Sequence, residues 1–280
     1  MDETYGIERL KALNGVNTSA LASHLRAEVI EMSHRARAAH LASALSCMDI
    51  LCVLYADVLQ VDPQYPNAPD RDRFILSKGH AAAALYAVLA WKGFLRREQL
   101  LSYGQQGSLL EEHPSPKLLG VEAASGSLGH GLPIGNGMAL AARIRQHPYR
   151  VYVLISDGEC NEGSVWEAAM FAARHGFDHL TAIVDYNKWQ ATGRSQEVLQ
   201  LEPLAKKWVS FGWDVIEVDG HDHRELRQAL TRKQIGLPRL IIAHTVKGKG
   251  VSFMEDDNNW HYRVPTAEEV QAARVELGIP

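Results

Sequence analysis

The first part of the chain carries apolar side chains at helical spacing. Behind the candidate N-caps Asn17 and Thr18, leucine, valine and methionine residues recur every three or four positions, which predicts a helix within 17–40. The stretch SALSCMDILCVLYADVL, residues 43–59, predicts a second and more buried helix. A loop rich in Pro and Asp, residues 63–73, follows. We therefore expect a helical layer before the pattern changes.

From residue 73 onwards, short apolar runs alternate with helical patterns. The expected strands are RFILS (73–77), YRVYVLIS (149–156), LTAIVDYN (180–187), WDVIEVDG (213–220) and PRLIIAHTV (238–246). The expected helices are 79–93, 163–176, 202–212 and 222–232, and the tail 256–278 ends in one more. Continuous β-branched runs joined by helices indicate a parallel sheet that is covered on both faces. The pattern predicts one doubly wound α/β domain over 1–280.

Composition and charge narrow the class of protein. The chain is 46% hydrophobic and 22% charged, as in a soluble globular protein, and its net charge of −4 comes with scattered basic residues, which disfavours nucleic acid as a partner. The first residues, MDETYGIERL, lack a basic region followed by an apolar stretch, so we expect no secretory signal, and the most apolar window is too short to span a membrane. Cys47, Cys52 and Cys160 have no metal-site spacing, and the first two lie in the buried helical pattern. We expect a cytoplasmic protein with reduced thiols.

The stretch SDGECNEGSVWEAAM, residues 156–170, places acidic residues where a predicted strand turns into a helix. In a parallel sheet, ligands bind beyond the carboxyl ends of the strands. The helix from Ser164 rises about 18 Å and the strand after it returns about 20 Å. Asn187 is therefore expected at the same edge of the sheet as Asp157. Each residue alone could simply cap a turn, and that alternative stays open for either one.

A carboxylate, an amide oxygen and a nearby backbone carbonyl form an incomplete octahedral set of oxygen ligands. Mg²⁺ prefers such a set when substrate phosphates and water complete it. Gly158 allows a close approach to the backbone, and the helix that opens near Gly163 presents its positive end to an anion. We therefore predict a metal-bridged diphosphate at Asp157 and Asn187. Glu159 is expected to face solvent or to have a local role at the helix end.

The acid, glycine and asparagine at this spacing resemble the thiamine diphosphate signature, in which a GDG follows one strand and an N follows the next. The first glycine is Ser156 here, and a serine fits only with a negative φ. Further stretches resemble the N-terminal half of transketolase: AAHLASALSCMDIL, with Ala39 and Ala42 where glycines are usual, DRFILSKGHAAAALYA, EEHPSPKLLGVEAASGSLGHGLPIGNGMALA, and TVKGKGVSFME followed by WH. The resemblance implies the thiamine diphosphate-binding fold in its diphosphate-binding form.

The resemblance also implies roles for individual residues around the cofactor. Asp157, Asn187 and the backbone carbonyl of Trp189 would hold Mg²⁺, and Gly158 would lie at the diphosphate. The other implied cofactor contacts are His80 and His261 at diphosphate oxygens, Gly126 at the aminopyrimidine, Leu128 between the two cofactor rings, and Lys247 near the diphosphate. His40, His113 and His261 would face the substrate hydroxyl groups and move protons.

Family members continue into a pyrimidine-binding domain that has no counterpart in this sequence. We therefore expect this chain to be one subunit of a split transketolase whose partner is the C-terminal, pyrimidine-binding subunit, in an α2β2 heterotetramer. Glu162 would lie at the contact that connects two cofactor sites. The expected reaction is transfer of a two-carbon ketol unit from a ketose or ketose phosphate to an aldose.

Two alternatives remain open from the sequence. The α subunit of a 2-oxo acid dehydrogenase shares the aspartate and asparagine signature, although the histidines of SKGH and HPSP favour transketolase. A non-catalytic cofactor-binding module is the second alternative, raised by Ser156, Ala39 and Ala42. Within GHDH, residues 220–223, we expect Asp222 to be a helix N-cap rather than the histidines to be a metal pair.

Overall fold

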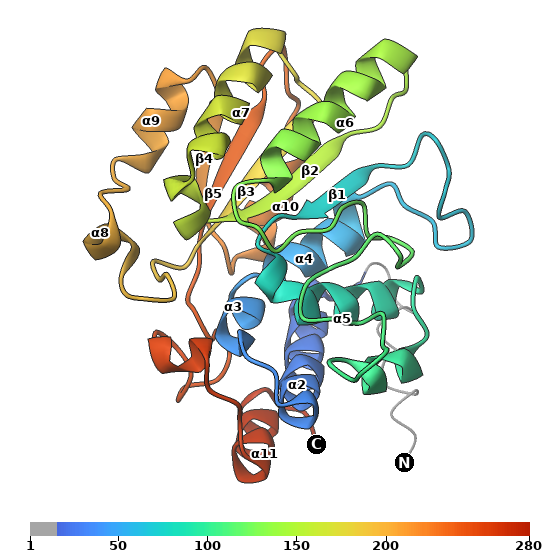
Figure 1. Cartoon of the computed structure of the whole chain (residues 1–280), viewed down its shortest axis with the longest axis vertical. Helices are drawn as coiled ribbons and strands as arrows, with labels where there is room; N and C mark the ends of the chain where they lie inside the picture. The colour runs from blue at the N-terminus through green and yellow to red at the C-terminus, as the bar shows by residue number, and fades with distance from the viewer. Residues whose placement is uncertain (1–15) are drawn as a thin grey trace.

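A computed structural model describes residues 16–280, and a parallel sheet lies at its centre (Figure 1). Within this part of the chain, the sheet has five strands in the order β1-β2-β3-β5-β4. The strands are β1 (Arg73–Leu76), β2 (Val151–Ser156), β3 (Leu180–Tyr186), β4 (Asp214–Asp219) and β5 (Arg239–His244). All neighbours pair in parallel, which confirms the predicted sheet. The N-terminal segment 1–15, which is part of the predicted domain, lies outside the described residues.

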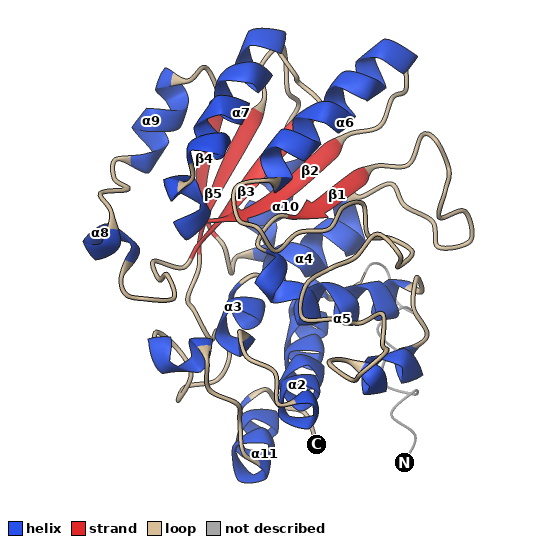
Figure 2. Ribbon diagram, viewed as in Figure 1, coloured by secondary structure: helices blue, strands red, loops and turns tan. Residues whose placement is uncertain are grey.

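Helices cover both faces of the sheet (Figure 2). The helices are α2 (Thr18–Ala36), α3 (Leu41–Ser46), α4 (Met48–Val53), α5 (Ala82–Lys92), α6 (Gly131–Arg145), α7 (Gly163–His175), α8 (Ser195–Val198), α9 (Leu204–Ser210), α10 (His223–Thr231) and α11 (Ala267–Glu276). Alternate residues of β2 point to opposite faces. Val153 packs in the cluster formed with α6, α7 and α9, whereas Leu154 packs in the cluster formed with α2, α4, α5 and α10.

Polar side chains cap several of the helices. The side chain of Asn17 accepts a hydrogen bond from the Ala20 amide at 3.1 Å, which confirms the predicted start of α2. Asp222 accepts from the amides at the start of α10, so the predicted N-cap is also confirmed. The flanking His221 and His223 both contact the buried Asp49 carboxylate, at 2.6 and 2.9 Å. These histidines tie the loop before α10 to the helical layer.

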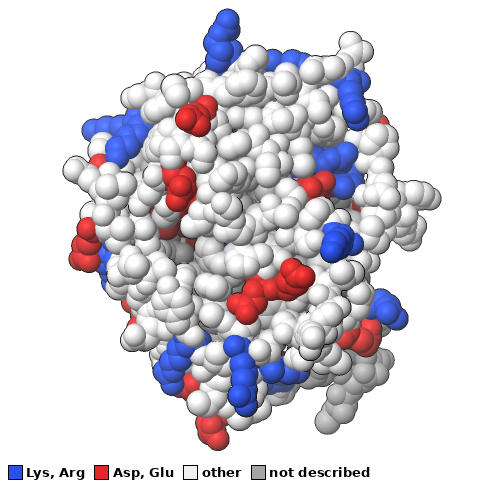
Figure 3. Space-filling model, viewed as in Figure 1, with Lys and Arg blue, Asp and Glu red and all other residues white. Residues whose placement is uncertain are grey.

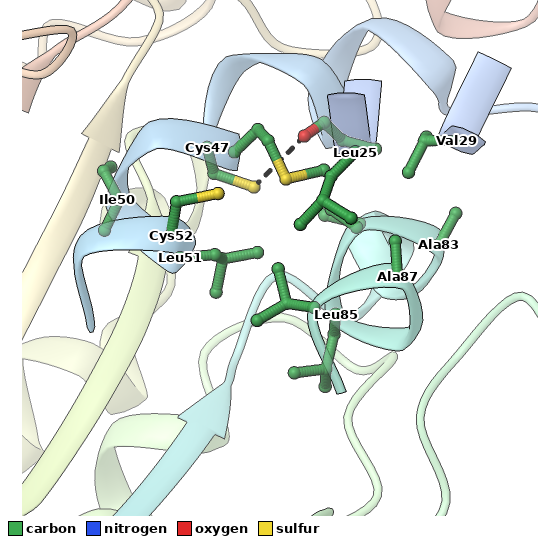
Figure 4. Packing of buried hydrophobic residues seen from close by; sticks show 14 of the residues in the cluster. Leu25, Val29, Cys47, Ile50, Leu51, Cys52, Ala83, Leu85 and Ala87 are labelled. Atoms are coloured by element: carbon green, nitrogen blue, oxygen red, sulfur yellow. Dashed lines mark hydrogen bonds between the residues drawn. The ribbon is translucent and has the colours of Figure 1, made fainter. Parts of the chain in front are cut away.

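The buried helical pattern over 43–59 forms three short pieces rather than one helix. Cys47, with ψ near 3°, separates α3 from α4, and a π-helical turn over Leu54–Val58 closes the segment. Cys47 and Cys52 pack among leucines such as Leu25 in the core (Figure 4). Burial raises the pKa of Cys47 to about 12, so this thiol behaves as a core residue, as predicted.

Charged side chains of both signs are interspersed over the face seen in Figure 3, without a continuous basic patch. Within residues 16–280, none of the helices has the length and apolar character that a membrane crossing requires.

Candidate active site

A cavity of about 450 Å³ lies where β1, β2 and β3 end. Its volume suits a cofactor-sized ligand. The structure brings ten of the predicted site residues to its wall: His40, His80, His113, Gly126, Leu128, Gly158, Glu162, Asn187, Trp189 and His261. The two other predicted residues, Asp157 and Lys247, are fully buried next to this wall. The predicted constellation therefore exists in space, although its segments are far apart in the chain.

Asp157 follows β2 directly, and its carboxylate holds the end of the neighbouring strand β3. One oxygen accepts from the Gly158 amide at 2.9 Å. The other accepts from the Lys188 amide at 2.9 Å and from the Ser195 hydroxyl at 2.8 Å. The residue after Asn187 thus contacts Asp157 directly, which confirms that β2 and β3 end at one edge.

The environment of Asp157 fits a bound cation. Burial is the main cause that raises the pKa of Asp157 to about 6, opposed by the hydrogen bond from Ser195. Each hydrogen-bond donor to this carboxylate is uncharged. A divalent ion at this edge would stabilise the ionised form. Within 16–280 no three His, Cys, Asp or Glu side chains gather as a metal site, but the predicted set needs only one carboxylate.

The amide of Asn187 is held in one orientation. Its nitrogen donates to Ser46 Oγ at 3.3 Å and to Asp185 Oδ2 at 3.4 Å. Its oxygen accepts from the Trp189 amide at 3.1 Å. Because the nitrogen is engaged on the protein side, the oxygen is the atom that can serve a metal ligand set.

Asp185 belongs to a buried ion pair that the sequence analysis missed. Its carboxylate pairs with the Lys78 ammonium, and both side chains are completely buried. Lys78 also donates to the Ser43 carbonyl at 2.9 Å, and Asp185 accepts from Ser46 Oγ at 2.6 Å. Burial opposes ionisation of both groups, yet each partner outweighs it, so the pKa of Asp185 is lowered and that of Lys78 is raised. Through the hydrogen bond from Asn187 to Asp185, the pair also helps to hold the Asn187 amide in place.

Four histidines form a cluster in the cavity. The centroid of the His40 ring lies 5.6 Å from that of His80, 6.4 Å from that of His113 and 5.0 Å from that of His261. Burial is the main cause that lowers the pKa of His40, lowers that of His80 far below its usual value, and lowers that of His261 to about 3. These three rings are neutral near pH 7, so each can donate one hydrogen bond and accept another.

His40 occupies an unusual backbone conformation at the start of α3. Its φ is 66°, in the left-handed region, and its amide donates to the His261 carbonyl at 2.7 Å. Glu112 Oε2 lies 3.7 Å from His40 Nδ1. A non-glycine residue held at positive φ is strained, and such strain is typical of functional sites.

Lys247 lies behind His261 rather than on the cavity wall. Its ammonium donates to Asn258 Oδ1 at 2.6 Å and to His261 Nδ1 at 3.1 Å. Because a protonated amine can only donate, Nδ1 of the ring is the acceptor and the imidazole proton lies on Nε2. The structure thus gives Lys247 a contact that orients His261.

Replacement of Lys247 by Met should change how stability depends on pH. Burial, followed by the charge of Lys78, lowers the pKa of Lys247 to about 8, whereas an unfolded lysine titrates near ~10.4. Between these values the unfolded chain binds more protons, so wild-type stability falls as pH drops from about 10 to about 8. Methionine does not titrate, so the variant lacks this loss. The free energy of unfolding of Lys247→Met minus that of wild type should therefore be larger at pH 7 than at pH 10, by up to about 3 kcal/mol.

Urea unfolding of both proteins at the two pH values measures this difference. The neighbouring Lys249, which pairs with Glu255 at 3.3 Å near the surface, provides the matched control. Lys249→Met should show almost the same difference from wild type at both pH values. If the difference in unfolding free energy from wild type changes with pH equally in both variants, the lowered pKa of Lys247 is contradicted.

Glu159 is buried, so the expectation that it faces solvent is wrong. Its carboxylate accepts from the Ser77 hydroxyl, from the Gly129 amide at 2.9 Å and from the Ser156 amide at 3.1 Å. The short 3₁₀ turn Gly158–Asn161 directs the side chain inward, where these donors need an acceptor. Ser156 has no positive φ, as its place in the signature requires. Glu162, by contrast, is exposed at the start of α7.

Gly79 allows the segment after β1 to lie against the segment around Ser125. A Cβ at Gly79 would lie 1.9 Å from the Ser125 carbonyl oxygen, and one at Gly126 would lie 3.0 Å from the His113 ring. Real Cβ atoms cannot approach so closely to backbone. The two glycines therefore bring His80 and His113 to the same cavity.

Gly79→Ala should destabilise the protein by at least about 2 kcal/mol, because the backbone must shift to relieve the overlap. Urea unfolding measures the change. Gly137 in α6 is the matched control, since a Cβ there meets nothing within 4 Å. Gly137→Ala should be neutral or stabilising by up to about 1 kcal/mol. Equal stabilities for the two variants would show that the close approach is not required.

Known proteins resemble the chain over nearly its whole length. The family model described as "Transketolase, thiamine diphosphate binding domain" matches residues 17–280. A protein of Phocaeicola vulgatus that is named as a subunit of apulose-4-phosphate transketolase is 43% identical over 90% of this chain and 90% of its own length. A subunit of 6-deoxy-6-sulfo-D-fructose transketolase from a Clostridium species is 42% identical over 85% of this chain and 88% of its own length.

Solved structures of transketolases are also similar to this chain. The crystal structure of transketolase from Campylobacter jejuni superposes with a TM-score of 0.89 at 30% identity. The match covers 95% of this chain and 43% of that protein. The chain therefore spans less than half of the longer relative, but nearly the whole of the two subunits.

Proposed function

The chain belongs to the transketolase family, and we propose that it is the thiamine diphosphate-binding subunit of a split transketolase. Together with a pyrimidine-domain partner subunit, it would transfer a two-carbon ketol unit from a ketose to an aldose. The names and lengths of the two relatives support this proposal, since both are subunits of similar size. An α2β2 heterotetramer in the cytoplasm is the assembly we propose.

One observation supports the proposal most strongly: the four clustered histidines and Asn187 line the same cavity, and Asp157 lies directly beside it. Asp157, Asn187 and the carbonyl of Trp189 would hold Mg²⁺, and Gly158 would lie at the diphosphate. When bound, thiamine diphosphate supplies the reactive carbon and the electron sink for breaking and forming the carbon–carbon bond. The protein supplies binding, orientation and proton transfer.

The histidines suit that division of labour. His261 carries its proton on Nε2 because Lys247 donates to Nδ1, so it can donate to a diphosphate or substrate oxygen. His80 would donate to the diphosphate as well. His40 and His113 would exchange protons with substrate hydroxyl groups, for which a neutral imidazole is suited. Gly126 and Leu128 would contact the cofactor rings.

Mixing the purified chain with a pyrimidine-domain subunit, thiamine diphosphate and Mg²⁺ tests the proposal. We expect cofactor binding and ketol transfer from a donor panel that includes ketose phosphates and a sulfonated ketose, because the two relatives are named for such sugars. No cofactor binding in that mixture would reject the proposal. Oxidation of pyruvate would point to a 2-oxo acid dehydrogenase, and binding without turnover to a non-catalytic module.

A further inference from the structure

Gln190 carries a buried donor that has no partner. Its amide nitrogen, Nε2, is shielded from solvent and makes no hydrogen bond within the described part of the chain, and the residue lines the cavity. Buried polar groups in proteins are nearly always hydrogen-bonded. A buried donor without a partner, on a residue that lines a cavity, therefore indicates that a ligand supplies the acceptor.

The segment that carries Gln190 is anchored, so the amide is placed in advance of binding. The Gln190 backbone amide donates to the Gly193 carbonyl at 2.9 Å, and Trp189 and Arg194 pair as a short antiparallel bridge. The Arg194 guanidinium lies 3.7 Å from the centroid of the Trp189 ring. Asp256 accepts from the Trp189 indole at 2.8 Å and from Arg194 at 2.7 Å. Gln190 thus extends from a cross-linked turn.

The neighbours of the side-chain amide identify the kind of acceptor. A Cβ built on Gly158 would lie 3.1 Å from Gln190 Cγ and 3.8 Å from Nε2, so the side chain packs directly over Gly158. Gly158 adjoins Asp157, and Trp189 precedes Gln190, so each of the two residues in contact is next in sequence to a proposed metal ligand. A metal held by one carboxylate draws anionic oxygens to complete its shell. Those oxygens would be suitable acceptors for this donor.

We propose that Gln190 donates a hydrogen bond from Nε2 to a diphosphate oxygen of the cofactor. The inference rests on the proposed function and adds Gln190 to the residues that are predicted to contact the diphosphate. Hydrogen bonds to charged acceptors are stronger than neutral ones. Gln190 is thus a binding residue that strengthens retention of the diphosphate.

Isothermal titration of the chain with its partner subunit, at saturating Mg²⁺, tests this contact. Gln190→Met keeps the length of the side chain and removes the donor, and it should weaken thiamine diphosphate binding about 10-fold. Gln190→Glu should weaken it further, because a carboxylate would face the diphosphate. Inorganic pyrophosphate should lose affinity in parallel. Gln105→Met, at an exposed glutamine, is the control and should bind like wild type.

Each outcome decides between the inference and the function on which it rests. If wild type binds and Gln190→Met binds equally well, the contact is wrong while the proposed function stands. If wild type does not bind at all, the proposed function fails. Equal losses for thiamine diphosphate and for thiamine, which lacks the phosphates, would place the amide at a ring and overturn the assignment.

A measurement on the wild-type chain removes any dependence on the folding of variants. The side-chain amide of Gln190, observed by nitrogen-15 NMR, should shift when thiamine diphosphate and Mg²⁺ are added to the complex. Thiamine with Mg²⁺ should leave the signal in place. An amide signal that does not respond to the diphosphate would overturn the inference even if both variants unfolded.

Discussion

Asp157→Ala is expected to abolish Mg²⁺-dependent retention of thiamine diphosphate. Asp157 is the one charged group among the proposed metal ligands, and its other contacts are uncharged donors. Its loss removes the charge that holds the ion as well as one oxygen ligand. Since changes to groups that merely support a metal ligand already cost about 10- to 100-fold in affinity, the loss here should exceed about 100-fold.

Gel filtration followed by assay of the retained cofactor measures the effect. Asp157→Asn separates the effect of charge from that of shape, because the asparagine side chain fills the same space without the charge. This variant should still lose most of the bound metal. Asp62→Ala is the control: Asp62 accepts from the Gln64 amide in the loop before β1, away from the cavity. Circular dichroism verifies that each variant is folded. Retention by Asp157→Ala at the wild-type level would reject the metal assignment.

The sheet was predictable from sequence because most of its strands are largely apolar runs with turn residues at their ends. Leu180–Tyr186 is buried throughout, so the apolar run and the strand coincide. The edge shared by Asp157 and Asn187 then follows from chain length alone. The break at Cys47 within the buried helical pattern was not predictable, because apolar side chains on all sides hide where one helix ends and the next begins.

Side-chain directions account for the rest of what the sequence analysis missed. Glu159 is one residue from Gly158, and only the turn Gly158–Asn161 decides that it points inward to the Gly129 and Ser156 amides. Gln190 likewise has no sequence signal for its open donor. One signal was present for the buried pair: Asp185 interrupts the otherwise apolar stretch that forms β3, and a buried charge requires a partner.

Lys78→Met is expected to destabilise the protein by about 3–5 kcal/mol, because it leaves the Asp185 carboxylate buried without its cation. Both side chains are completely inaccessible, so water cannot replace the lost partner. Urea unfolding of the metal-free chain measures the loss. Lys117→Met is the matched control, since Lys117 is exposed, and it should change stability by less than about 0.5 kcal/mol.

The double variant Lys78→Met with Asp185→Asn distinguishes an uncompensated charge from a general packing defect. An asparagine at 185 keeps one oxygen, which can accept from Ser46 as Oδ2 does in wild type, whereas its amide nitrogen replaces the oxygen that accepts from Thr245. If the stranded charge causes the loss, the second substitution should restore much of the stability, and the two effects should be strongly non-additive. If the two losses simply add, the pair contributes through packing, and its support of Asn187 must be assigned to Ser46 instead.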